Sequence, residues 1–451
     1  MINVRTMIRN LASLLLIPAA MVAQSIEGDW NVKTRDVALE IHISKSGRGY
    51  TGKLRNMDHP EVAIPLAGIV ARGGRIRFEV PVVKAAFEGT LKDSTSLEGA
   101  WTQAGIHSAL RFERGKWTPT LAVGHPFPPN LDIQVRMPPT PVPAGGAYYS
   151  VYELHLNNFN SRRIDVRRVE VWGSEKLMTL EGESLAAAMY GSPAMIEGGG
   201  RAVLMLWLKT ERPPVELRHK VMAQFAGYQD PMEIDGGPVV VGADLIPLGP
   251  PLKGENWKAF AGPSPDSHHR KTLGAFEGRL TGAQRFAIDF ARIGPDGKPF
   301  TGKGSNNQDH HGWGAEVIAV ADGVVAAALD GMPDGTPSLD RSAQNSNPPD
   351  LESAVGNWVA LEVGPGRYAH YVHLQSGSLR VRAGDRVRRG QVIGLLGNSG
   401  NSTGPHLHFQ VTDGPSPLGS EGVPYVFNRF SRDGVVHVNE IPLRDWVMCF
   451  P

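Results

Sequence analysis

A short segment near the C-terminus constrains the fold of this chain more than any other. Residues 398–410 read N-S-G-N-S-T-G-P-H-L-H-F-Q, a glycine-rich turn that leads into a strand. Alternate side chains of a strand share one face, so we expect His406 and His408 to project together, about 7 Å apart at their Cα atoms. Leu407 and Phe409 then face a core. One imidazole can bind a metal ion while its neighbour contacts what the metal activates.

The segment G-N-S-G-N-S-T-G-P-H-L-H-F resembles the C-terminal signature of the M23 (LytM, lysostaphin-like) zinc endopeptidases, which cut peptidoglycan peptides. The resemblance extends over about residues 262–427, where further runs follow in the order of that family. They are short β-branched segments separated by glycine turns, as an antiparallel sheet requires. The runs are V-I-A-V-A-D-G-V-V at 317–325, G-N-W-V-A-L-E-V at 356–363, Y-A-H-Y-V-H-L at 368–374 and A-G-D-R-V-R-R-G-Q-V-I-G-L-L-G at 383–397.

One position departs from the pattern of the family. Members usually carry H-x-x-x-D for the first two zinc ligands, whereas residues 285–289 read R-F-A-I-D. A guanidinium offers no lone pair, so Arg285 cannot replace an imidazole on zinc. The run S-H-H-R at 267–270 resembles a branch of the family that carries S-x-H-R-R upstream of Q-R-F-A-I-D. That branch implies His269, rather than His268, as the missing ligand.

The resemblance implies one zinc ion per chain, with His269, Asp289 and His408 as ligands and a fourth position open to water. An open position is typical of a catalytic rather than a structural zinc site. Zinc lowers the pKa of such a water, and a nearby imidazole can then accept its proton. His373 and His406 match the two catalytic histidines of the family that are not ligands. This match implies that they orient water and stabilise the oxyanion.

Two further side chains are expected to contact substrate. If His269 is a ligand, Arg285 is expected near the metal or the mouth of the groove, where its guanidinium would bind a substrate carboxylate. Strand alternation places Tyr371 on the face of His373 and sends His370 to the other face. We therefore expect Tyr371 to bind substrate and His370 to be structural.

Two loops are less informative. Residues 330–354 are rich in Pro, Asp, Ser and Asn and show no periodicity, which predicts an insertion between two strands. This insertion is either a groove wall that selects substrate or a surface loop. His310 and His311 lie in a glycine-flanked loop and are interpreted as solvated residues.

Length and charge indicate a multidomain protein without a general affinity for polyanions. The chain has 451 residues, enough for about three domains. Its 46 Lys and Arg against 45 Asp and Glu exclude a global attraction to nucleic acid or anionic membrane. Arg5 and Arg9 precede an apolar stretch, 11–23, which predicts a signal peptide at 1–23 and no membrane span after its cleavage. With Cys449 as the single cysteine, we expect export to a bacterial periplasm or exterior without an intrachain disulfide.

The predicted fold is all-β and multidomain, with two N-terminal β-barrel or β-sandwich modules before the M23-like antiparallel sheet. Alternating strands such as 38–43 and 75–80 predict a small antiparallel domain. Later strands predict an immunoglobulin-like sandwich, in which His155 and His219 are interpreted as structural. Proline-rich joints lie at 126–143 and 247–253. The expected divisions are 24–117 for the first domain, 120–250 for the sandwich, 262–430 for the M23-like domain and 431–451 for a C-terminal tail.

Two functions of different classes remain open. The first is a zinc endopeptidase that hydrolyses peptide bonds in peptidoglycan stem peptides or cross-bridges. The second is a degenerate, metal-free module that binds cell wall, or regulates a cell-wall amidase or a divisome partner. Arg285 favours the second function, while the retained Asp289 and the three matching histidines favour the first. Which peptide bond is cut depends on groove shape, which the motif does not encode.

Overall fold

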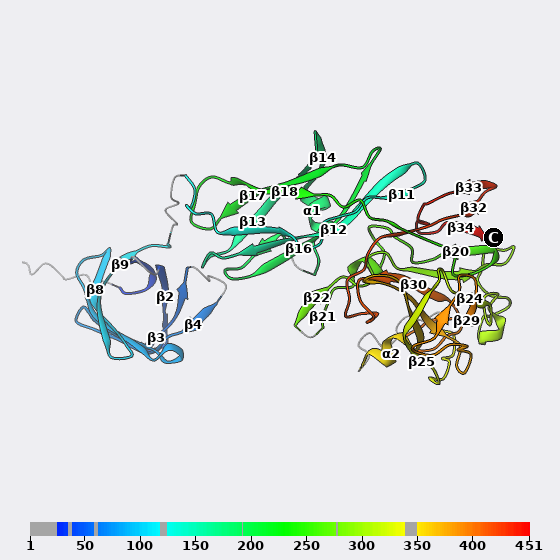
Figure 1. Ribbon diagram of the computed structural model, residues 1–451. Helices are drawn as coiled ribbons and strands as arrows, with labels where there is room; N and C mark the ends of the chain where they lie inside the picture. The colour runs from blue at the N-terminus through cyan, green and yellow to red at the C-terminus, as the bar shows by residue number, and fades with distance from the viewer. Residues whose placement is uncertain are drawn as a thin grey trace, which may run out of the picture. The chain divides into compact units, whose positions relative to one another are not determined.

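The chain forms two compact units, residues 1–121 and 122–451, and strands dominate both (Figure 1). The all-β expectation is therefore confirmed. Among the described residues, no helix is both long and apolar enough to cross a bilayer. The signal peptide expected at 1–23 lies outside the described residues. The computed structural model describes residues 25–34, 38–57, 62–117, 124–191, 193–276, 278–338 and 350–451.

The first unit is an antiparallel meander that nearly closes into a barrel. β1 (Gly28–Lys33) pairs with β9 (Ile106–Arg114), and each described strand pairs with the next along the chain except β4 (Ala63–Pro65) with β5 (Ala67–Arg72). Alternate side chains fill the interior, including Trp30, Phe78, Phe87 and Phe112, each 0% exposed. The other elements are β2 (Ala38–Ser46), β3 (Gly49–Asn56), β6 (Arg75–Val80), η1 (Pro81–Val83), β7 (Ala85–Leu91) and β8 (Ser96–Gln103).

The second unit begins with a sandwich of two antiparallel sheets. In the first sheet, β12 (Ala147–Asn158) pairs on one side with β10 (Leu131–Val135) and β11 (Val142–Ala144), and on the other with β16 (Arg201–Thr210). The inward side chains of both sheets form one apolar core. The second sheet contains β13 (Ile164–Trp172), β14 (Lys176–Glu181), β15 (Met195–Ile196), β17 (Glu216–Phe225) and β18 (Met232–Val240), and α1 (Gly182–Ala188) follows β14.

The rest of the second unit is built on a large sheet, of which the structure describes ten strands. Its middle strands are β-branched and aromatic and are buried on both faces, which holds their backbone rigidly. From edge to edge the order is β28 (Arg386–Val387), β25 (Gly323–Leu329), β26 (Asn357–Gly364), β27 (Arg367–Leu374), β30 (Leu407–Thr412), β23 (Ile288–Arg292), β20 (Gly254–Ala259), β34 (Val447–Phe450), β32 (Phe430–Arg432) and β33 (Val435–His437).

Short elements surround this sheet. β21 (Gly274–Phe276) and β22 (Arg279–Thr281) form a hairpin, and β24 (Glu316–Ile318) pairs with β29 (Val392–Leu395). The single turns η2 (His269–Lys271) and η3 (Asn307–Asp309) and the short α2 (Leu351–Val355) lie in the connections.

Two expected boundaries fall inside the second unit. The proline-rich joint at 247–253 contributes β19 (Ile246–Leu248), which pairs in parallel with β31 (Tyr425–Phe427). Leu248 and Leu252 are 1% and 0% exposed. The residues set apart as a tail, 431–451, include β34, which pairs with β20 inside the large sheet.

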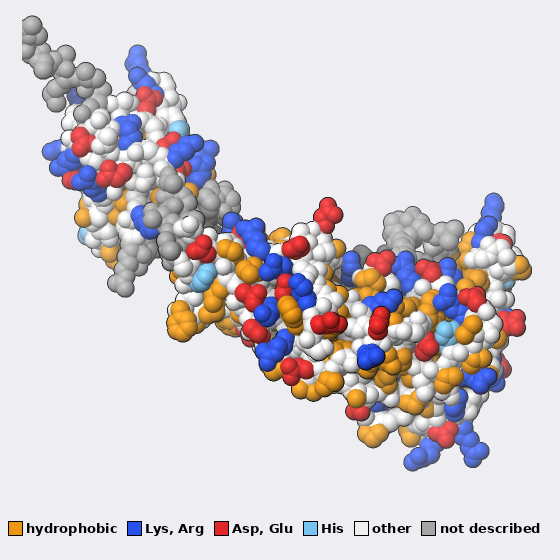
Figure 2. All heavy atoms as spheres, turned by 90° about the horizontal axis from the view of Figure 1, so that it is seen from above, with side chains coloured by type: hydrophobic (Ala, Val, Ile, Leu, Met, Phe, Trp, Pro, Cys, Tyr) orange, Lys and Arg blue, Asp and Glu red, His pale blue; other side chains and the backbone are white. Residues whose placement is uncertain are grey.

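The sandwich and the large sheet also share apolar contacts. Val142, Ala144 and Val151 of the sandwich belong to the same buried cluster as the aromatic side chains of the large sheet. The sandwich is therefore packed into the core of its neighbour rather than tethered to it. On the face shown in Figure 2, acidic and basic side chains are interspersed, in keeping with the net charge of +1.

Candidate metal centre

The neighbouring strands β23 and β30 bring an aspartate and a histidine together. Asp289 and His408 are direct partners in the register, and His408 Nδ1 lies 2.9 Å from Asp289 Oδ1. Leu407 and Phe409 are 0% exposed and fill the core on the opposite face, as the alternation predicts. Two rigid strands thus fix both side chains on one face of the sheet.

His269 reaches the same carboxylate from the turn η2. Its Nε2 lies 3.4 Å from Asp289 Oδ2, and its ring centroid lies 4.7 Å from that of His408. Between η2 and β23 the chain reverses direction through the β21–β22 hairpin. This reversal allows a histidine of η2 to approach Asp289. His269 is 4% exposed.

His268 lies beside this group. A ligand atom from each of His268, His269 and Asp289 lies within 4.8 Å of the others. His268 is exposed, whereas His269 and His408 are buried and each is held through its second ring nitrogen. We therefore assign the candidate ligand set to His269, Asp289 and His408.

The hydrogen-bond partners of the two histidines decide where their lone pairs point. A neutral imidazole carries one proton, and a carbonyl oxygen can only accept. His269 Nδ1 donates to the Ala261 carbonyl at 2.9 Å, which leaves the lone pair on Nε2, facing Asp289. His408 Nε2 donates to Gln410 Oε1 at 2.8 Å, which leaves the lone pair on Nδ1, also facing Asp289.

The orientation of Gln410 is itself fixed. Its amide nitrogen donates to the Pro417 carbonyl at 2.6 Å, so Oε1 must face His408. Gln410 shares the His408 face of β30 by strand alternation, and this signal in the sequence could have identified it. Metal-binding histidines usually have such a partner on the second nitrogen. The donor set, two imidazole lone pairs and one carboxylate, therefore fits zinc.

Electrostatics keep these groups in the protonation states that a metal needs. Burial lowers the pKa of His269 to about 3 against the opposing pull of Asp289, so the imidazole is neutral at neutral pH. Burial alone would raise the pKa of Asp289, but the neighbouring imidazoles of His269 and His406 hold it well below its usual value. Asp289 is therefore anionic and His269 neutral at neutral pH.

His373 and His406 lie next to this set. Their ring centroids are 4.8 Å apart, and that of His373 lies 6.0 Å from that of His408. His406 Nδ1 donates to the Gly404 carbonyl at 2.8 Å, and His373 Nδ1 donates to the Ser399 carbonyl at 2.8 Å. In both rings the lone pair is thus left on Nε2. Burial, followed by the neighbouring His406 and His408, lowers the pKa of His373 well below its ordinary value.

The five residues lie in a groove with a volume of about 1010 Å³. Ser338 and Ala354, from the described ends of the insertion at 330–354, line this groove. The insertion is also tied to the site, since the Asp334 carboxylate accepts backbone N–H bonds from Ser376 and Asn398. The described part of the insertion therefore forms a wall of the groove.

The sequence of this part of the chain matches a known family. Residues 310–419 fit the pattern of peptidase family M23. This is an M23 peptidase domain. The match contains His373, His406 and His408 of the M23 domain, whereas His269 and Asp289 precede it.

Curated relatives of the M23 domain include proteins named as endopeptidases, and the similarity is local. For three such relatives, the chain covers between 13% and 26% of their length. The peptidoglycan DD-endopeptidases ShyA and ShyC of Vibrio cholerae are 45% identical over 57 residues (13% of this chain and 13% of that protein) and 30% identical over 126 residues (28% and 26%). The glycyl-glycine endopeptidase ALE-1 of Staphylococcus capitis is 46% identical over 56 residues (12% and 15%).

Solved structures are also similar to the M23 domain. The catalytic domain of the M23 protein EnpA from Enterococcus faecalis, as its A109H mutant, is 23% identical, with 41% of this chain and 95% of that chain covered. The catalytic domain of lysostaphin from Staphylococcus simulans is 22% identical, with 37% and 88% covered. Their TM-scores are 0.22 and 0.21, so these superpositions add nothing to the fold described above.

Arg285 does not lie where the sequence suggested. It is 5% exposed, and its guanidinium is bound by the carboxylates of Glu153 and Glu421 and by the Gly422 carbonyl. The expectation that Arg285 binds a substrate carboxylate is wrong, because buried protein acceptors already occupy its donors.

Tyr371 is also a core residue of the M23 domain, and its expected contact with substrate is wrong. It is 0% exposed, pairs with Phe409 in the register, and its hydroxyl accepts a hydrogen bond from the Val320 N–H at 2.8 Å. The alternation breaks at His373, where a φ of +64° turns the chain, so His373 and Tyr371 do not share a face. His370 is structural as expected, with Nε2 2.6 Å from Thr412 Oγ1.

Three further histidines lie outside the ligand set, one in the groove and two in the sandwich. His310 lines the groove and is 8% exposed, with Nε2 3.2 Å from the Gly304 carbonyl, so its interpretation as a solvated residue is wrong. His219 has a structural partner in the sandwich, the Tyr152 hydroxyl at 2.8 Å. His155 is 5% exposed.

Proposed function

We propose that this protein is an exported zinc-dependent endopeptidase that hydrolyses peptide bonds in peptidoglycan stem peptides or cross-bridges. The observation that carries the proposal is the convergence of three donor atoms, His269 Nε2, an Asp289 carboxylate oxygen and His408 Nδ1, with lone pairs aimed by fixed partners. The names of the curated relatives support the same class of substrate.

Zinc held by these three residues would supply a Lewis acid and a water of lowered pKa. The protein residues supply the remaining functions. Two neutral imidazoles and one carboxylate carry a charge of −1, so a bound Zn²⁺ would leave the site with a net charge of +1, which favours negative charge that develops on a substrate oxygen. The groove walls align an extended peptide beside the ligands.

His406 and His373 are proposed to handle the proton and the developing charge. Each holds its Nδ1 proton on a backbone carbonyl, so Nε2 is free to accept a proton from water. Once protonated, the same nitrogen can donate a hydrogen bond to the carbonyl oxygen of the scissile bond. The low pKa of His373 keeps its imidazole in the accepting form before the reaction.

The arginine at 285 had favoured a metal-free regulator of a cell-wall amidase. His269 supplies the third ligand atom that this chain lacks at Arg285, where the family pattern has a histidine, and this geometry supports the enzyme over the regulator. Export to the periplasm or the exterior belongs to the proposal, because peptidoglycan is reached there.

The test is a metal analysis coupled to turnover. Purified protein should contain one zinc per chain and should release peptides from isolated peptidoglycan. A chelator should abolish release, and added zinc should restore it. Absence of zinc after repletion, in a protein that is folded, would support the regulator and overturn the enzyme.

A further inference from the structure

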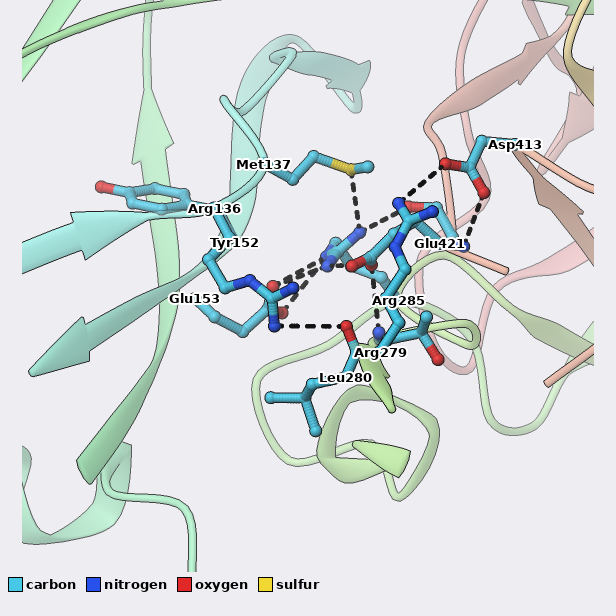
Figure 3. Close-up of polar contacts among 12 residues, drawn as sticks. Arg136, Met137, Tyr152, Glu153, Arg279, Leu280, Arg285, Asp413 and Glu421 are labelled. Carbon is cyan, nitrogen blue, oxygen red and sulfur yellow. Dashed lines mark hydrogen bonds and ion pairs between the residues drawn. The ribbon is translucent and has the colours of Figure 1, made fainter. Parts of the chain in front are cut away.

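A second buried polar cluster lies between the sandwich and the M23 domain. It contains two carboxylates and two guanidiniums, which balance in charge. Figure 3 shows three of its members, Glu153, Arg285 and Glu421. Charged groups are almost never fully buried unless they are paired. The members, here called the Glu153 cluster, are Glu153, Arg270, Arg285 and Glu421, at 5%, 3%, 5% and 6% exposure.

Glu153 is the member that belongs to the sandwich. It lies on β12, opposite Met205 of β16, in the middle of the first sheet. Arg285 Nη2 lies 2.6 Å from Glu153 Oε2 and 3.0 Å from Glu421 Oε2, so it is held by one carboxylate from each side. Burial would raise the pKa of Glu153, but Arg285 and Arg270 lower it to about 2. The carboxylate is therefore charged at any working pH.

Arg270 ties the turn η2 to the same strand pair. Its Nη1 donates to Glu153 Oε1, and its Nη2 donates to the carbonyls of Tyr152, at 2.5 Å, and Leu206, at 3.3 Å. The guanidinium is thus anchored on β12 and β16 at three points. The turn itself is short, three residues with its own backbone hydrogen bonds, and would not hold its position alone.

His269 precedes Arg270 in this turn. In the H-x-x-x-D pattern both ligands would come from one stretch of chain, whose backbone sets their spacing. Here His269 and Asp289 come from separate segments, so a contact outside that stretch must place the imidazole. The arginine that follows His269 makes that contact, and Arg285 fixes the start of the Asp289 segment on the same carboxylate.

We propose that Glu153 is a positioning residue of the metal centre, which acts through Arg270 to hold His269 toward Asp289. The sandwich thereby completes the site in this chain. The inference rests on the proposed zinc site and goes beyond it, because it assigns a role in metal binding to a residue of a different domain. Partners that orient a metal ligand typically change metal affinity by about 10- to 100-fold when they are replaced.

The test compares Glu153→Gln with a matched variant, both in the full chain. Glu170→Gln is the control, because Glu170 is a sandwich glutamate of 7% exposure that pairs with Arg168 and Lys176 away from the site. Zinc affinity is measured by competition with a chelator. We expect affinity about 10- to 100-fold weaker for Glu153→Gln and within about twofold of wild type for Glu170→Gln.

A cobalt spectrum separates positioning from general loss of stability. Cobalt(II) absorption reports the number and geometry of ligands, whereas lower stability of a folded protein does not change it. The spectrum of Glu153→Gln should move toward that of His269→Ala, and that of Glu170→Gln should match wild type. A folded Glu153→Gln protein with wild-type affinity and spectrum would overturn the inference. A wild-type protein that binds no zinc would instead overturn the proposed function.

A second variant covers the case in which Glu153→Gln does not fold. Arg270→Lys keeps the positive charge, but a single ammonium cannot reach Glu153 and both carbonyls as the guanidinium does. It should weaken zinc binding by a similar factor, and adding Glu153→Gln should weaken it no further, because both changes break one link. Wild-type zinc affinity in folded Arg270→Lys would also overturn the inference.

Discussion

The ligand set around Asp289 and the Glu153 cluster are both largely buried and polar, yet their charges are balanced in different ways. In the Glu153 cluster each carboxylate faces a guanidinium, and the charges cancel within the protein. In the ligand set two imidazole lone pairs face one carboxylate, an arrangement of acceptors that calls for a cation between them. The charges of the first arrangement balance within the protein, whereas the second is completed by an added positive ion.

This difference shows how burial can serve two purposes. At Glu153, burial strengthens the attraction between fixed opposite charges, which locks two segments onto a third. At His269, burial lowers the pKa and keeps the imidazole neutral, which prepares it for a metal. Arg270 belongs to the Glu153 cluster and follows His269 directly in the chain. The rigid cluster therefore holds the neutral imidazole in place.

The largest expected effect is on metal content. Asp289→Ala and His408→Ala should each abolish zinc binding, because a set of three ligands falls to two. His373→Ala and His406→Ala should retain one zinc per chain and lose turnover. Metal analysis and peptide release from peptidoglycan measure the two properties. If His373→Ala and His406→Ala were folded but metal-free, the division between ligands and catalytic histidines would be wrong.

The two clusters should differ in their effect on the stability of the metal-free protein. Glu153→Ala should lower the free energy of unfolding by about 3–5 kcal/mol, because it leaves two buried guanidiniums short of a carboxylate. Asp289→Ala should lower it far less, since it removes a carboxylate that faces lone pairs. Urea unfolding after chelation measures both. Equal losses would show that the ligand set is also a stabilising element of the apoprotein.

The free energy of unfolding should depend on pH through His219, a residue of the sandwich outside the metal centre. Burial lowers the pKa of His219 to about 4, from 6.5 in the unfolded chain, so the unfolded state binds the proton first. The contribution of His219 is fully present above pH 6.5 and is lost as the pH falls toward 4, by about 3 kcal/mol at most. His219→Gln should flatten the acid limb of the unfolding free energy and leave zinc affinity at neutral pH unchanged. An unaltered acid limb would contradict this assignment.

The smallest effect is expected from removal of the first unit. All members of both clusters lie in the unit 122–451. A chain that begins at Ala122 should therefore bind zinc within about twofold of the full-length protein, as expected for domains with separate cores. Chelator competition on the two proteins makes the comparison. Loss of zinc in a folded, truncated protein would give the first unit a role in the site.

Local patterns in the sequence were sufficient for the β30 half of the site. Alternation placed His408 opposite the core residues Leu407 and Phe409, and the structure confirms that arrangement. Such a prediction succeeds because strand geometry depends on neighbouring residues only. The same rule failed at Tyr371, because the positive φ of His373 interrupts the alternation and a periodic pattern does not reveal a break of this kind.

The position of the first histidine and the fate of Arg285 were decided by tertiary structure. The sequence by itself determined that this chain has an all-β fold with an M23 domain, that Arg285 cannot bind zinc, and that a histidine from 267–270 is the candidate replacement. The sequence did not show how His269 is held near Asp289. We propose that Glu153 has this role, acting through Arg270. Glu153 lies in a different sheet, 132 residues before Arg285, and only folding brings Glu153 and Arg285 together. Contacts between distant charges leave no periodic trace in a sequence, because they depend on how whole sheets pack.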